Sequence, residues 1–159
     1  MRMEFLSKAK DALLGGSRAD VVLDVPGAAE LGEPLRVVVT VTVKDAAIEI
    51  RSVMVEVTCE EIVDASQMRM EGALTSNERE DSLAPEIRTT LASETVAVSG
   101  AASLAARSVT QFAGTIVPPS TAPPSAHGHH AEFCWTIRAR VDMKGRDPRS
   151  GWQALEVAS

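Results

Sequence analysis

The chain has 159 residues, of which 45% are hydrophobic and 24% are charged, and its formal net charge is -6. This is the composition of one globular domain, and it excludes a chain that is disordered throughout. The two cysteines exclude a disulfide-dense secreted scaffold. The acidic balance disfavours nucleic-acid binding, which needs a basic surface. Aromatic residues make up only 3% of the chain, so its core has to be aliphatic.

No apolar run approaches the length of a membrane span, and residues 1–8 lack the continuous apolar segment of a secretory signal. We therefore expect a cytoplasmic protein with reduced thiols.

Residues 1–16 predict a short amphipathic helix that ends at Gly15-Gly16. Its apolar face comprises Phe5, Leu6, Ala9, Ala12 and Leu13. A helix of this length is not stable alone in water, so the apolar face has to dock. We expect it to dock on its own domain, and the alternative is a membrane surface or a partner protein.

After Gly16 the hydrophobic period changes from 3.6 to 2, which predicts strands. The first strand covers residues 19–25 and closes at Pro26-Gly27. The clearest strand covers residues 35–43 and is dominated by valine. A third strand covers residues 48–59. Its apolar phase changes near Arg51-Ser52, which indicates either a β-bulge or a separate short strand at residues 48–50.

Residues 64–93 are polar and rich in turn-forming residues, so they predict a long loop between strands. Residues 95–98 are compatible with a short strand, and residues 108–117 predict another strand. The segment Pro118–Ser125 is rich in proline and predicts an extended connection.

The last part of the chain predicts a long strand over residues 132–143, a turn over residues 144–151 and a final strand over residues 153–157. The inward side of the long strand carries Phe133, Trp135, Ile137, Ala139, Val141 and Met143. The pattern as a whole predicts an all-β fold. We expect an antiparallel, immunoglobulin-like β-sandwich of about seven to eight strands over residues 17–159, preceded by the short N-terminal helix.

The second half of the chain resembles the arrestin-like family. The shared pattern is Phe112-x-Gly114-x-Ile116-x-Pro118, then Pro124-Ser125, Gly128, and Phe133-x-Trp135-x-Ile137-x-Ala139-x-Val141-Asp142. In the first half, Gly32-Glu33-Pro34 is similar to the family's turn before the second strand. The tail Arg146-Asp147-Pro148, with Leu155-Glu156-Val157, resembles bacterial members, including the sporulation-control group.

The resemblance implies an arrestin-type β-sandwich that acts as a non-enzymatic scaffold or adaptor. Family members usually carry two tandem sandwiches, whereas this chain has room for one. Phosphate sensing in eukaryotic arrestins uses basic residues of the first strand. Because the corresponding segment here is Arg18-Ala19-Asp20-Val21-Val22, without a basic pair, we do not expect phosphopeptide binding.

All three histidines lie in His127-Gly128-His129-His130. Imidazoles so close together are candidate ligands of zinc, nickel or copper, so a metal-binding enzyme or metal sensor is the alternative function. Neighbouring residues at the start of a strand point to opposite faces, however, which favours solvated turn residues. We therefore expect no metal site and no cofactor.

Cys59 lies in the apolar phase of its strand and is expected to fill the core, whereas Cys134 lies in the outward phase. No Cys-x-x-Cys spacing supports a redox pair. Arg138 and Arg140 share the outward face of the long strand. They are suited either to grip a carboxylate or phosphate, or to pair across strands with Glu56 or Asp24, which we favour.

No nucleophile, paired carboxylate or phosphate-binding loop combines into a catalytic pattern, so we expect no catalytic residues. The function we expect is protein interaction, through strand edges and through loops at residues 64–93 and 118–130. We expect the partner to be a protein, and a homodimer is one way to replace the second sandwich.

Overall fold

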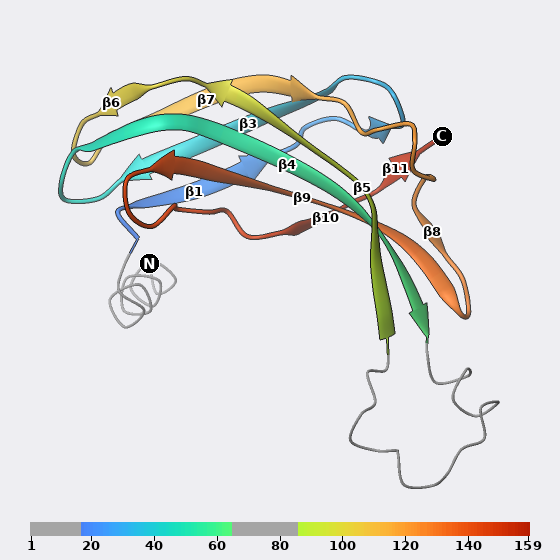
Figure 1. Ribbon diagram of the computed structural model, residues 1–159. Coiled ribbons are helices and arrows are strands. Elements are labelled where there is room, and N and C mark those ends of the chain that lie inside the picture. The colour runs from blue at the N-terminus through green and yellow to red at the C-terminus, as the bar shows by residue number, and fades with distance from the viewer. Residues whose placement is uncertain (1–16, 65–85) are drawn as a thin grey trace, which may run out of the picture.

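The computed structural model describes residues 17–64 and 86–159, and these residues form two facing antiparallel sheets (Figure 1). The smaller sheet contains β1 (Ala19–Asp24), β3 (Leu35–Val43) and β7 (Val109–Ile116), in the order β1-β3-β7. The larger sheet has the order β10-β9-β4-β5. Its strands are β10 (Gln153–Leu155), β9 (Ala131–Met143), β4 (Ile48–Asp64) and β5 (Glu86–Ser99).

Four short strands complete the described fold. In the larger sheet, β6 (Ala102–Leu104) pairs with β4 and β8 (Ala126–His127) pairs with β9. The remaining pair, β2 (Ala29–Glu30) and β11 (Val157–Ala158), is parallel. The antiparallel β-sandwich predicted from the sequence is therefore confirmed, with more strands than expected because two-residue and three-residue strands leave no visible alternation.

The core lies between the two sheets and is aliphatic. Fully buried valines of β3, β4 and β9 face each other from the two layers. Trp135 is the large aromatic side chain of this core, and its indole Nε1 donates a hydrogen bond to the carbonyl oxygen of Pro123 at 2.9 Å. The strong alternation of the sequence thus marks the strands whose one face is buried.

At one side of the sandwich, β5 packs closely against β7 at Gly114. A Cβ atom added to Gly114 would lie 2.6 Å from Cγ1 of Val98, which is closer than real side chains approach. Gly114 therefore permits close packing between the two sheets at this point.

The predicted bulge in the third strand is confirmed. The pairing of β4 with β9 shifts register between Ile50 and Ser52, within one continuous strand. The predicted final strand over residues 153–157 is instead divided at Glu156 into β10 and β11, which pair with different strands.

The predicted loop over residues 64–93 is wrong for Asp64, which ends β4, and for residues 86–93, which form the first half of β5. This half of β5 is exposed on both faces, so it has no buried positions to produce hydrophobic alternation. The remaining part of the predicted loop, residues 65–85, lies outside the described residues, as does the predicted helix over residues 1–16. Among the described residues there is no helix long and apolar enough to cross a membrane.

Candidate interaction surface

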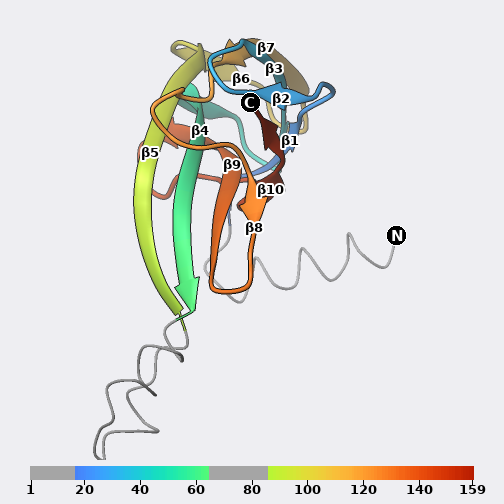
Figure 2. The ribbon, with the colours of Figure 1, turned by 90° about the vertical axis from the view of Figure 1, so that its right-hand side faces the viewer.

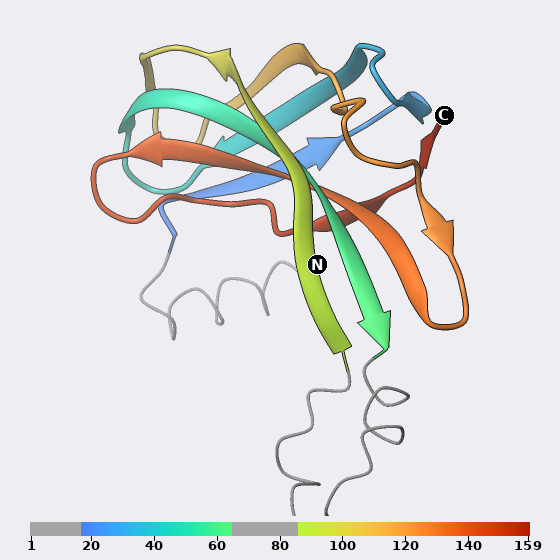
Figure 3. The same cartoon turned by 45° about the vertical axis from the view of Figure 1, so that its right-hand side comes forward.

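The larger sheet extends beyond the smaller one (Figures 1 and 3). We call this extension the ribbon: residues 58–64 of β4, residues 86–94 of β5 and residues 131–134 of β9. The three strands stay paired along it, from Thr58 opposite Thr136 and Ser93 to Val63 opposite Ala131 and Ile87. The ribbon is therefore a continuous three-stranded sheet with one bulge, at Leu91, and its inner face is less covered than that of the sandwich.

The inner face changes character along β4. Val53, Val55, Val57 and Cys59 have no exposed surface, whereas the next two residues of the same phase, Glu61 and Val63, are partly exposed. Opposite them on β5 lie Thr89 and Ile87, and Ile87 is 46% exposed. The inner face of the ribbon thus carries exposed apolar and acidic side chains where the sandwich carries its core.

β5 forms the edge of the larger sheet, as Figure 2 shows. It pairs with β4 on one side, and no described strand pairs with its other side. Two register shifts of the β4–β5 ladder, at Cys59/Glu60 and at Val53/Met54, leave Leu91 and Val98 as bulged residues of β5. Between the bulges, residues 92–97 pair regularly, so the free edge presents an uninterrupted row of backbone donors and acceptors there.

The charge of the ribbon is strongly acidic. Its carboxylates are Glu60, Glu61, Asp64, Glu86, Glu94 and Glu132, and its one lysine or arginine is Arg88. The Arg88 guanidinium already lies 3.4 Å from Glu60 and 3.2 Å from Glu86. Glu61 and Glu94, in contrast, form no ion pair with any residue that the structure describes.

The outward-facing arginines of β9 pair across the strands, as predicted. Glu56 of β4 accepts hydrogen bonds from Nε of Arg138 and from Nε of Arg140, both at 3.2 Å, and Arg140 also contacts Asp147 at 3.3 Å. The exposed Trp152 ring lies 4.3 Å from the guanidinium carbon of Arg138. The partner is Glu56 rather than Asp24. Because the charges compensate each other, this cluster stabilises the sheet and presents no open anion site.

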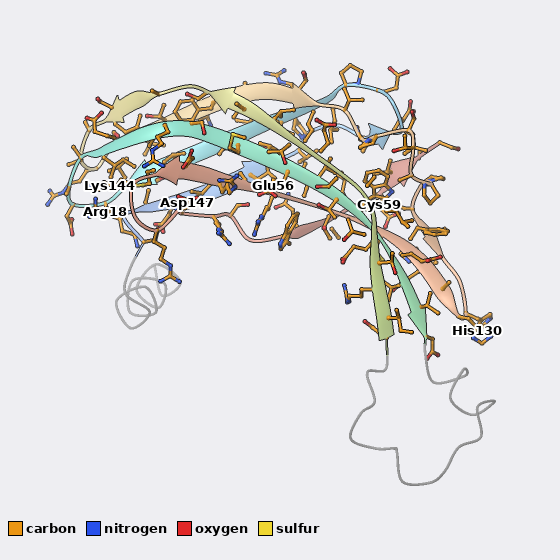
Figure 4. All side chains as sticks on the ribbon, viewed as in Figure 1. Arg18, Glu56, Cys59, His130, Lys144 and Asp147 are labelled. Carbon is orange, nitrogen blue, oxygen red and sulfur yellow. The ribbon has the colours of Figure 1, made fainter. Side chains whose placement is uncertain are left out.

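The histidine segment forms the hairpin between β8 and β9, and Figure 4 shows His130 at its tip. Each ring nitrogen of His127 faces a carboxylate: Nδ1 lies 3.0 Å from Glu132 and Nε2 lies 3.4 Å from Glu156. These hydrogen bonds raise the pKa of His127, first through Glu132 and then through Glu156. Because the two carboxylates lie on opposite sides of the ring, they cannot both join the same ring nitrogen on one metal ion.

The rings of His129 and His130 have centroids 6.3 Å apart. No group of three metal-ligating side chains was found among the described residues, which include this whole segment. The metal-site alternative therefore gains no support from the geometry.

The two cysteines are placed as the sequence predicted, with Cys59 in the core and Cys134 partly exposed. Burial, followed by the proximity of Cys134, raises the pKa of the Cys59 thiol to about 11. Burial and then Glu132 raise the pKa of Cys134. Both thiols are therefore protonated near neutral pH, and neither has the lowered pKa of a catalytic cysteine.

The sequence did not identify the edge of β5 as a candidate contact surface. The available signal was the enrichment of β-branched residues in the predicted loop, such as Ile87, Thr89 and Thr90. This signal marks a strand that is exposed on both faces, where apolar alternation is absent.

No protein-family model and no curated protein matches the chain. The structure is similar to the crystal structure of Spo0M, a sporulation control protein from Bacillus subtilis, with a TM-score of 0.63 and 16% sequence identity. The match covers 90% of this chain and 50% of that one, so the chain spans about half the length of Spo0M. The fold of the chain is therefore the arrestin-like β-sandwich that its sequence resembles.

Proposed function

We propose that the chain is a non-enzymatic, regulatory interaction module of arrestin-like type, which binds a protein partner through the free edge of β5. The observation that carries this proposal is the edge itself: a 14-residue strand, paired on one side, with Ile87 and Leu91 exposed. Such an edge can accept an extended segment of another protein through backbone hydrogen bonds.

Two further observations support the proposal. The structurally similar Spo0M is described as a sporulation control protein, which is a regulatory role. The predicted contact region at residues 64–93 includes the first half of β5, now as a strand rather than a loop. In this proposal that half contributes an ordered surface to the interaction.

Site-specific photo-crosslinking in the native host tests the proposal. A photoreactive amino acid replaces Thr95 on β5, and a matched control variant carries it at Val22, which is 60% exposed on the outer face of the smaller sheet. We expect a discrete adduct with another protein from position 95 and not from position 22. Absence of a position-specific adduct in cells that express the folded protein would contradict the proposal.

A further inference from the structure

The charges and the free backbone of the ribbon together specify the chemistry of the partner. We infer that the segment bound at β5 is a basic, extended stretch of polypeptide that adds to the free edge as a further strand of the larger sheet. This inference rests on the proposed function and narrows it from a protein partner to one chemical class.

The free backbone determines the geometry of binding. Residues 92–97 pair regularly with β4, and the other side of β5 has no described partner strand. An extended segment can satisfy these donors and acceptors by forming one more ladder, as in strand addition. The two bulged residues limit the regular part of the edge at both ends.

The carboxylates of Glu61 and Glu94, which form no ion pair within the described residues, favour a basic segment. Glu94 lies on the edge strand itself and is exposed, and Glu61 lies on the neighbouring strand opposite Thr89. Both belong to the inner face, because Glu94 pairs with the core residue Val57 and Glu61 continues the phase of Cys59. A lysine or arginine on the inner face of an added strand can lie opposite Glu94. A second cation, about four residues along the added segment and beyond the bulge at Leu91, is needed to reach towards Glu61 across the small Thr89.

The remaining side chains of the ribbon reinforce this preference. Arg88 is occupied by Glu60 and Glu86, so it offers little attraction to an acidic segment. The exposed Ile87 lies on the same inner face as Glu61 and Glu94, so it can contact the alkyl stems of lysine or arginine side chains on that face. An acidic segment would meet like charges and is therefore disfavoured.

A second copy of this chain is the competing occupant of the edge, since two β5 strands can in principle pair with each other. If two β5 strands paired antiparallel about Glu94, each Glu94 would lie opposite the Glu94 of the other copy. Like charges directly opposite each other are destabilising. The charge pattern therefore favours a basic partner over self-pairing.

The test measures binding of labelled peptides to the full-length protein. The probe is the peptide Lys-Val-Lys-Val-Lys-Val-Lys. One control replaces lysine by glutamate, and two others carry backbone N-methyl groups on alternate residues, one for each hydrogen-bonding register. We expect the lysine probe to bind, with an affinity that falls as salt is raised. We expect at least one N-methylated probe to bind roughly tenfold more weakly or not at all.

Protein variants locate the site. The double variant Glu61→Gln/Glu94→Gln removes two carboxylates without breaking an ion pair of the described structure, so it should fold normally. We expect it to bind the lysine probe roughly threefold to thirtyfold more weakly. The matched control Glu30→Gln/Glu33→Gln, outside the ribbon, should bind like the parent protein. Hydrogen exchange should show protection of β5 amides by the probe.

Several results would overturn the inference. These are equal binding of the glutamate probe, unchanged binding of both N-methylated probes, equal effects of the two double variants, or protection confined to β1 or β7. A dimer whose β5 amides are already protected without peptide would assign the edge to a second copy. If the lysine probe fails while crosslinking from Thr95 succeeds, the interaction function stands and only the basic class of the partner is wrong.

Discussion

The two halves of β4 differ in how far the opposing sheet covers their inner face. From Val53 to Cys59 its inner face is fully buried by the opposing sheet. From Glu61 to Asp64 the strand keeps its pairing with β5 and β9, while its inner face is partly exposed. The backbone ladder is therefore common to the sandwich and the ribbon, and the difference lies in what covers the side chains. Hydrophobic burial stabilises the first region, whereas in the second only Ile62 is buried and the inner face is available for contacts.

The largest contrast is expected for large-to-small substitutions in the two regions. Trp135→Ala removes a fully enclosed side chain and its hydrogen bond to Pro123, and it should lower the free energy of unfolding by about 3–5 kcal/mol. Val63→Ala, in the ribbon, should change it by no more than about 0.5 kcal/mol. Chemical denaturation of both variants measures the contrast, and similar losses would show that the ribbon belongs to the cooperative core.

A smaller contrast is expected between two carboxylates that each pair with arginine. Glu56 accepts hydrogen bonds from Arg138 and Arg140 and is only 18% exposed, so Glu56→Ala should cost about 1–3 kcal/mol. Glu60 contacts only the exposed Arg88, at 3.4 Å, among the ion pairs that the structure describes. Glu60→Ala should therefore cost about 0–1 kcal/mol.

Denaturation at low and high salt measures this second contrast. The contribution of the Glu60–Arg88 ion pair to the free energy of unfolding should decrease as the salt concentration is raised, because salt screens exposed ion pairs more than enclosed ones. Equal salt dependence of the two variants would mean that the Glu56 cluster is as solvated as the ribbon.

The smallest effect concerns the exposed bridge of His127 to Glu132 and Glu156. The pKa of His127 is raised in the folded state, so its stabilising contribution is complete below its ordinary pKa of 6.5 and is lost as the pH rises through the raised value. The parent protein should therefore exceed His127→Gln in stability near pH 6 by more than it does near pH 9.

Denaturation of both proteins across this range measures the difference. The pKa of Glu132 is lowered, mainly by its hydrogen bond to His127, so its own contribution is present above its ordinary pKa of 4.5 and is lost as the pH falls through the lowered value. The stabilising contribution of the bridge should therefore be measurable at pH values between the lowered pKa of Glu132 and the raised pKa of His127. A difference that grows above pH 8 would contradict the bridge.

Side-chain alternation made most of the sandwich predictable. β1, β3 and β9 were expected within a few residues of their observed bounds, and so was the bulge in β4. Each of these strands has one buried face, which forces apolar residues into every second position. The core position of Cys59 and the pairing of Arg138 and Arg140 with Glu56 followed from the same phase.

The first half of β5 was not predictable in this way. Its residues Glu86–Ser93 are mostly exposed on both faces, so the strand depends on its ladder with β4 rather than on burial. Its role as the edge of the sheet is a property of the strand order, which pairs segments far apart in sequence.

The sequence by itself determined which residues face the core, because a buried face leaves a two-residue period in any strand that carries it. Only the tertiary structure decided where the opposing sheet ends. It therefore decided which side chains of the inward phase, such as that of Glu61, remain partly exposed. It also left the outer edge of β5 without a described partner. Local pattern encodes burial, whereas the extent of one layer over another depends on the packing of the whole domain.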